Sequence, residues 1–269
     1  MGGLTAPPFM LSLGSHHRPT VLNFTKGNAK LGKQTLIFNL PAGKTCPGAL
    51  HCKSWAVVNN QGKRSIQDGP QTIFRCFAAS GEVQYDGAFN NRAENLQTIV
   101  NYLQQGVDYT ANQISVAIQH FRTRNTELVR IHESGDFFNS IYLQAWVKVA
   151  KSNPELKFYC YSKSLHIFLE FGLDNLPENF YLTASYGGVY DDMINQGLFK
   201  RYAKVFKTEE DANTEGLQID HDDSHCFAPN PFGLLVHNTQ PKGSEWGKAI
   251  RLRRSKQQFS GYSKKPAVV

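Results

Sequence analysis

Short apolar runs of strand length recur through the second half of this chain. They cover residues 128–132, 157–161, 179–184, 203–206 and 232–237, and a similar run occupies residues 35–40. Most are followed by a polar or glycine-containing loop and then by a stretch with helical spacing of its apolar residues. Strand, loop and helix repeated in this order indicate βαβ units, which build parallel sheets with right-handed crossovers.

Three longer stretches have the three- and four-residue spacing of amphipathic helices: residues 91–105, 111–124 and 139–152. Together with the apolar runs they predict an α/β fold with about five or six mainly parallel strands. A closed barrel of this type needs eight strands. We therefore expect an incomplete (partial) β/α barrel, although an open sheet fits the same pattern.

The chain divides into three parts by composition. Residues 1–33 show little periodicity and are predicted to form an irregular N-terminal arm, with a short strand near residues 21–24. Residues 34–247 have no break in composition and are predicted to form a single α/β domain. Residues 248–269 form a basic C-terminal tail.

Composition excludes two broad classes of protein. Among the 269 residues, 41% are hydrophobic and 12% aromatic, which is typical of a folded domain rather than a disordered one. We find no apolar run of roughly 18 residues, so no membrane association is expected, and the N-terminus lacks the pattern of a signal peptide. We therefore expect a cytoplasmic protein, whose cysteines stay reduced and bind metal more readily than they form disulfides.

The net charge of +7 suggests a possible partner. Lysines and arginines number 29 against 22 acidic residues, and many lie in the tail, including Arg251, Arg253, Arg254 and Lys256. A basic segment of this kind can bind nucleic-acid phosphates. The alternative is a solvated terminus with no partner.

Four of the five cysteines lie in loop-like surroundings beside glycine, proline or histidine. Cys46 and Cys52 follow the run at 35–40, Cys76 stands in Arg-Cys-Phe-Ala, and Cys226 stands in His-Cys-Phe-Ala. We predict that these four thiolates converge on one metal centre, and that Cys160, in the middle of a strand, is an ordinary core residue. His51 and His225 each precede a cysteine and are candidates for replacing a thiolate ligand or for donating hydrogen bonds to the sulfurs; the alternative is that they lie on the surface or around the site without binding metal.

The spacing of the cysteines bears on which metal they bind. Structural zinc sites carry pairs of cysteines two to four residues apart on tight turns, and no such pair is present. Dispersed cysteines brought together by the fold favour a 4Fe–4S cluster, with zinc as the alternative. The Cys-x₃-Cys-x₂-Cys spacing of radical S-adenosylmethionine enzymes is absent. Four protein ligands would close the cluster, which would then transfer electrons to a redox partner or stabilise the fold.

Other candidate chemistry lies in the loops after the predicted strands, where parallel α/β proteins place their sites. Glu133 and Asp136 are candidates for a general acid and base, and Lys163 is a candidate for neutralising a phosphate or a cluster. The alternative is that Asp136 and the serines beside Lys163 cap the following helices. The acidic run at 220–225 is expected to be a surface loop rather than a divalent-ion site.

Several of these motifs resemble a known family. They are the run at 40–49, the segment 75–78, the Gly-Asp-Phe loop at 135–137 with the helix of Trp146, and the segment 161–164. Over roughly residues 28–240 the chain resembles the gene product 88 family of bacteriophages, an uncharacterised group. More distantly, it is similar to phage proteins with a partial barrel like that of radical S-adenosylmethionine enzymes. The resemblance implies a phage origin, a host-cell location and a cysteine-ligated cluster on a barrel-like scaffold, but no established activity.

Three hypotheses follow for the function. The first is a phage-encoded iron–sulfur protein with a redox or structural cluster. The second is a nucleic-acid-binding phage protein in which zinc or a cluster stabilises the fold and the basic tail binds phosphates. The third is a radical-type or hydrolytic enzyme that uses Glu133, Asp136 and Lys163.

Overall fold

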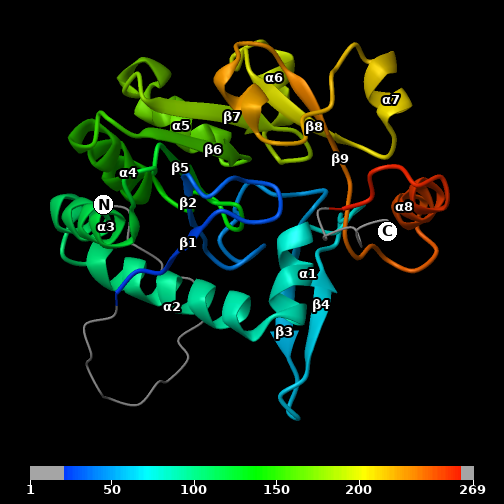
Figure 1. The fold of residues 1–269 in the computed structure, drawn as a ribbon, viewed down its shortest axis with the longest axis horizontal. Helices are drawn as coiled ribbons and strands as arrows, with labels where there is room; N and C mark the ends of the chain where they lie inside the picture. The colour runs from blue at the N-terminus through cyan, green and yellow to red at the C-terminus, as the bar shows by residue number, and fades with distance from the viewer. Residues whose placement is uncertain (1–20, 262–269) are drawn as a thin grey trace.

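The computed structural model describes residues 21–261, and a mostly parallel seven-stranded sheet runs through that part of the chain (Figure 1). The strand order is β1-β2-β5-β6-β7-β8-β9; β1 is antiparallel to β2, and every other neighbouring pair is parallel. The strands of this sheet are β1 (Phe24–Lys26), β2 (Thr35–Phe38), β5 (Leu128–Ile131), β6 (Lys157–Ser162), β7 (Phe180–Ser185), β8 (Tyr202–Phe206) and β9 (Phe232–Leu235). The prediction of an α/β fold with mainly parallel strands is confirmed.

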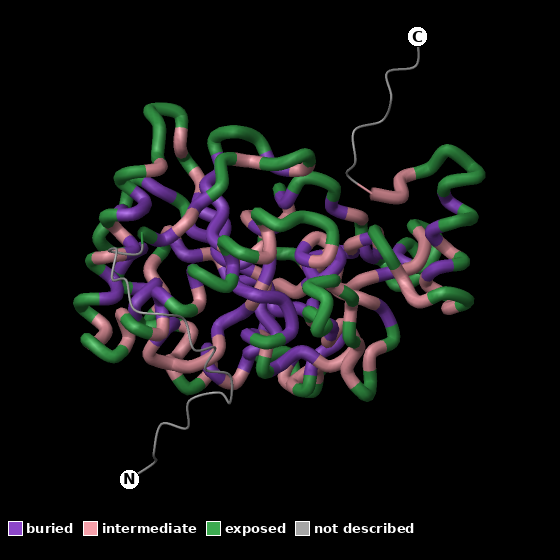
Figure 2. Tube along the Cα trace, turned by 90° about the horizontal axis from the view of Figure 1, so that it is seen from below, coloured by how far each residue is buried: buried purple, intermediate pink, exposed green. Residues whose placement is uncertain are grey.

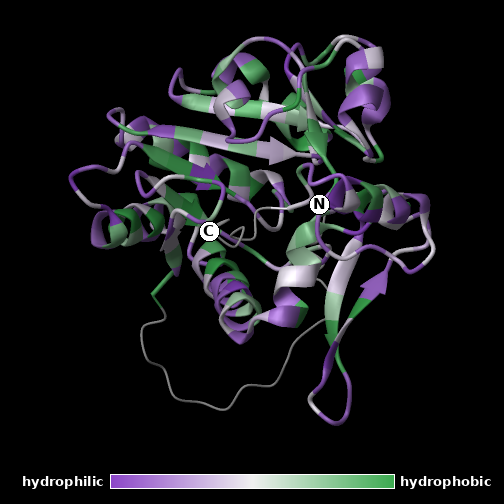
Figure 3. Ribbon diagram, turned by 45° about the vertical axis from the view of Figure 1, so that its right-hand side comes forward, coloured by the Kyte–Doolittle hydropathy of each residue, from purple (hydrophilic) through white to green (hydrophobic). Residues whose placement is uncertain are grey.

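Eight α-helices and a separate hairpin complete the described part of the chain. The hairpin pairs β3 (Ser54–Val58) with β4 (Arg64–Asp68). In Figure 1 it projects away from the main sheet beside α1, and Figure 3 shows its tip as hydrophilic. The helices are α1 (Phe77–Gln84), α2 (Asp86–Leu103), α3 (Val107–Phe121), α4 (Ser140–Ser152), α5 (Leu165–Phe171), α6 (Asp191–Asn195), α7 (Glu209–Thr214) and α8 (Glu245–Ser255).

The two faces of the main sheet are covered differently. One face packs against α3, α4 and α5 and forms the largest buried cluster, centred on Trp146, Phe38 and Phe158. Cys160 belongs to this cluster and is fully buried, as its position in a strand predicts. Figure 2 shows the buried segments as a band through the middle of the molecule. Because β2, β5 and β6 are buried on both sides, their sequences are mainly apolar and do not alternate with polar residues, apart from the buried Arg130 of β5.

The opposite face of the sheet carries Arg130, Tyr159 and Tyr161, and we call it the tyrosine face. The guanidinium of Arg130 lies over both rings, 5.5 Å from the centre of Tyr159 and 4.4 Å from that of Tyr161. Tyr159 also packs with Cys226 and Phe232 in a second, smaller buried cluster. This face therefore combines apolar packing with a buried cation.

Both ends of the predicted domain have regular structure. Strand β1 lies within the predicted N-terminal arm, of which residues 1–20 fall outside the described residues. Helix α8 takes up residues 248–255 of the predicted tail, and residues 262–269 fall outside the described part. No helix in the described part of the chain has the length and apolar content needed to span a membrane.

Candidate metal centre

The loop that follows β2, residues 40–52, carries Cys46 and Cys52 and lies across the carboxyl-terminal ends of the parallel strands. Its first residue is fixed where the amide of Leu40 donates to the carbonyl of Ser134 (2.9 Å). Its last turn is fixed where the amide of His51 donates to the carbonyl of Gly187 (2.9 Å). Ser134 follows β5 and Gly187 follows β7, so the loop bridges the ends of several strands. This edge is where parallel α/β proteins place their sites.

Two glycines allow the close approach between this loop and the strand ends. A Cβ atom on Gly48 would lie 2.0 Å from the carbonyl oxygen of Lys163, and one on Gly188 would lie 2.8 Å from the carbonyl oxygen of Gly48. The amide of Val189 donates to that same Gly48 carbonyl (2.9 Å). Only glycine fits at these two positions without moving the backbone.

The β3–β4 hairpin explains how Cys76 returns to the first two cysteines. Strand β3 begins two residues after Cys52, and the antiparallel pairing brings the chain back to Asp68 beside Ser54. Asp68 then holds Arg75 through a bidentate ion pair (2.7–3.0 Å). The amide of Cys76 donates to the hydroxyl of Ser54 (3.0 Å). The 23 residues between Cys52 and Cys76 therefore contain a hairpin that brings Cys76 back beside Ser54, close to Cys52 in the chain.

The three thiols lie close enough to influence one another electrostatically. Burial raises the pKa of Cys46 well above its ordinary value, and the charges of Asp136, Cys76 and Cys52 raise it further. Burial, followed by the charge of Cys52, raises the pKa of Cys76 to about 12. The backbone amides of Ala78 and Ala79, at the start of α1, act in the opposite direction and favour the Cys76 thiolate. A cation among these thiols would remove their mutual repulsion and displace their protons.

All five cysteines carry free thiols. Among residues 21–261, however, no group of three or more His, Cys, Asp or Glu side chains could hold a single metal ion. One zinc ion draws its sulfur ligands to about 2.3 Å from a common point. A cubane cluster binds each thiolate through a different iron atom, so its ligands stand further apart. In the described part of the chain, the three neighbouring thiols therefore do not have the geometry of a single-ion site.

Cys226 has different surroundings from the other three predicted ligands. It is fully buried on the tyrosine face, where it packs with Tyr159, Ala203 and Phe232. Burial raises the pKa of its thiol, and the nearby guanidinium of Arg130 opposes that shift. The structure thus groups Cys46, Cys52 and Cys76 and places Cys226 in the core.

The predicted polar residues Glu133, Asp136 and Lys163 follow β5 and β6 and have separate roles. Glu133 accepts a hydrogen bond from Asn28 (2.6 Å). Asp136 is buried and accepts hydrogen bonds from the amide of Phe137 (2.7 Å), the hydroxyl of Ser162 (2.7 Å) and the amide of Lys163 (2.8 Å). Burial raises the pKa of Asp136, against the lowering effect of these hydrogen bonds. Asp136 therefore joins the ends of β5 and β6 beneath the cysteine loop rather than capping α4, whose N-cap is Asn139.

Lys163 is buried, and its ammonium group donates to the hydroxyl of Ser185 at the end of β7. A cation therefore lies at the same edge of the sheet as the cysteine loop, and its partner Ser185 is the last residue of β7.

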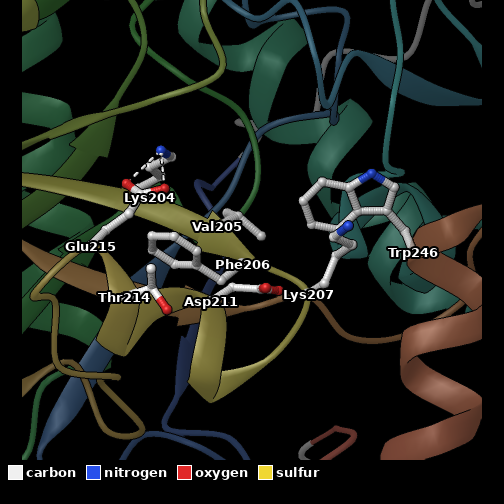
Figure 4. Close-up of a pocket in the computed structure, with 8 residues that line it drawn as sticks. All are labelled: Lys204, Val205, Phe206, Lys207, Asp211, Thr214, Glu215 and Trp246. Carbon is white, nitrogen blue, oxygen red and sulfur yellow. Dashed lines mark hydrogen bonds and ion pairs between the residues drawn. The ribbon is translucent and has the colours of Figure 1, made fainter.

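The remaining polar features lie elsewhere. Arg253 of the basic segment is buried in α8 and donates to the carbonyls of Val236 and Phe259. In the described part of the chain, a hollow of about 360 Å³ lies between β8, α7 and Trp246 (Figure 4). Within it Lys204 is paired with Glu215 (2.6 Å). This hollow contributes no cysteine to the candidate metal centre.

Fold and site together define an α/β protein whose parallel sheet carries a cysteine-rich loop over its carboxyl-terminal edge. The model of the family described as Gene product 88 matches residues 22–259, and the chain belongs to this family. A relative is the Gene 88 protein of Mycobacterium phage L5, 40% identical over 42 residues. That match covers 16% of this chain and 18% of the relative's length. No solved structure matches the chain.

Proposed function

We propose that this chain is a phage-encoded iron–sulfur protein, acting in the host cytoplasm, in which Cys46, Cys52 and Cys76 bind a 4Fe–4S cluster. The observation that supports it best is the electrostatic coupling of three thiols from two distant segments at the carboxyl-terminal edge of a parallel sheet. When bound, the cluster would supply one-electron redox chemistry or stabilise the loop. We also propose that the sheet is an incomplete β/α barrel with this site at its mouth.

The protein's own residues would hold and tune such a cluster. The carbonyl contacts of Gly48 and Gly187 fix the loop on the sheet. The amides at the start of α1 favour the thiolate form of Cys76, as a helix N-terminus does. With three cysteine ligands, such a cluster would leave one iron open to a further ligand, in contrast to the closed four-cysteine site that the sequence predicts.

The test is anaerobic reconstitution with ferrous iron and sulfide, followed by iron and sulfide analysis and visible absorption. Serine variants of Cys46, Cys52 and Cys76 should each lose the cluster. Cys160→Ala and Cys226→Ala are the matched controls and should retain it. A wild-type protein that stays colourless, or that holds zinc without sulfide, would refute the proposal. Loss of the cluster in Cys226→Ala alone among the controls would restore the four-ligand site.

A further inference from the structure

A single buried carboxylate on the tyrosine face attracts four donors from distant parts of the chain. It belongs to Asp223, which is 2% exposed. The guanidinium of Arg130 and the ammonium of Lys30 both form ion pairs with it. The hydroxyls of Tyr161 and Tyr159 donate to it over 3.1 Å and 3.3 Å. The acidic run at 220–225 is therefore only in part the surface loop that its composition predicts: His221, Asp222 and Ser224 are exposed, whereas Asp220 and Asp223 are buried.

One of the two cations in this group is built into the sheet, whereas Lys30 lies in the connection between β1 and β2. Arg130 stands on β5 with its guanidinium over the rings of Tyr159 and Tyr161, and it is 8% exposed. Its Nε is buried without a hydrogen-bond partner among the described residues. A buried guanidinium with an unused donor is the arrangement that binds planar carboxylates in two-point fashion. The strands therefore carry one more buried hydrogen-bond donor, the Nε of Arg130, than Asp223 uses.

Asp223, by contrast, comes from the connection between β8 and β9 and not from the sheet. It adopts a left-handed backbone conformation (φ 67°), which is uncommon for residues other than glycine. The short helical turn that follows it, Ser224–Phe227, seats Cys226 and Phe227 against Tyr159. Segment 220–227 therefore packs on the tyrosine face without being part of the sheet. It places the Asp223 carboxylate against donors that lie on β5 and β6.

We infer that the tyrosine face carries a carboxylate-binding site, built from Arg130, Lys30, Tyr159 and Tyr161, which Asp223 occupies as an internal ligand. A ligand with a carboxylate group would bind by replacing the Asp223 side chain. This site is independent of the cysteine centre and of the function proposed for it. Because Asp223 is tethered, its effective concentration is high, and a free carboxylate competes poorly while it is present.

The test uses Asp223→Gly, which removes the carboxylate and suits the left-handed backbone. Its melting temperature is measured in increasing sodium acetate against sodium chloride at equal ionic strength. We expect a loss of stability in chloride and a saturable recovery of about half of that loss or more in acetate, since a ligand that binds only the folded state stabilises it. Wild type should not respond to the same acetate concentrations. The matched control, Asp223→Gly with Arg130→Met, should also give no response.

A melting temperature of Asp223→Gly that is the same in acetate and in chloride would overturn the inference and leave Asp223 as a structural counter-ion. An equal response in the double variant would do the same, because the acetate would then act elsewhere. If Asp223→Gly does not fold in chloride, refolding is compared in the two salts. Folded protein in acetate alone supports the site, and none in either salt refutes it.

Discussion

The contact between Gly48 and Lys163 gives the sharpest test of how the cysteine loop is held. In Gly48→Ala the new Cβ would lie 2.0 Å from the Lys163 carbonyl oxygen and 2.4 Å from its carbon. Ordinary van der Waals contact begins at 3.4 Å, so the loop or the end of β6 must move by about 1.4 Å. The atoms in conflict belong to the backbone and cannot rotate away as a side chain would.

The expected cost follows from two terms. Overpacking of this kind costs about 1–3 kcal/mol, and a rigid backbone conflict belongs at the upper end. Displacement of the loop also weakens the hydrogen bond from Val189 to the Gly48 carbonyl, worth about 1 kcal/mol. A total of about 3–4 kcal/mol corresponds to a fall in melting temperature of roughly 10 °C for a chain of this size.

The assay is thermal unfolding by circular dichroism, with iron content measured after anaerobic reconstitution. Gly87→Ala is the matched control: its Cβ meets nothing within 4 Å, and alanine in place of glycine in a helix is neutral or slightly stabilising. We expect Gly48→Ala alone to lose both stability and iron. A Gly48→Ala protein with the melting temperature and iron content of wild type would show that the loop does not rest on Lys163.

Three further predictions concern the core and the strand ends. Trp146→Ala removes a fully buried indole and should lower the free energy of unfolding by about 3–5 kcal/mol in urea titrations; a loss below about 1 kcal/mol would contradict the assigned core. Asp136→Ala leaves the buried amides of Phe137 and Lys163 without their acceptor and should cost about 2–5 kcal/mol, whereas Ser164→Ala, whose hydroxyl has no partner among the described residues, serves as the control. Burial lowers the pKa of His132 in the folded protein to about 3, from the ordinary value of 6.5 that applies in the unfolded chain. As the pH falls, the unfolded chain therefore binds the proton before the folded protein does. The free energy of unfolding is thus unaffected by His132 above pH 6.5 and decreases as the pH drops from there towards 3. His132→Asn should flatten that slope in melts between pH 5 and 7.5, and an unchanged slope would assign the pH dependence to other groups.

The sequence predicted the parallel strands well because most of their residues are buried. Residues such as Val129, Phe158 and Leu182 lie in the large buried cluster, so their runs are mainly apolar and easy to recognise. Helices α3 and α4 were recognised for a related reason, since each has one apolar stripe against a polar surface.

The site was harder to predict because its geometry depends on long-range contacts. Strand β4 is hard to recognise from the sequence because Arg64–Asp68 is a polar, half-exposed stretch. Unless that hairpin is recognised, the sequence does not indicate that the chain brings Cys76 back towards Cys52. Likewise, nothing in the spacing of Cys226 distinguishes a ligand from a core residue, and Asp223 looks like a surface acid until Arg130 is placed opposite it.

The way the loop is fixed has a consequence for how the protein is made. The loop ends at Cys52, yet the contacts that seat it come from Gly187 and Gly188, more than a hundred residues later. The neighbouring Arg75 is held through its backbone by the side chain of Gln240, 165 positions away.

During translation, therefore, the three cysteines leave the ribosome long before the surfaces that shelter them exist. Contacts of such large sequence separation form late and slowly. The thiols must stay reduced through that interval, which makes synthesis rather than the folded state the stage most sensitive to oxidation. Expression under reducing conditions until folding is complete is the condition that this architecture favours.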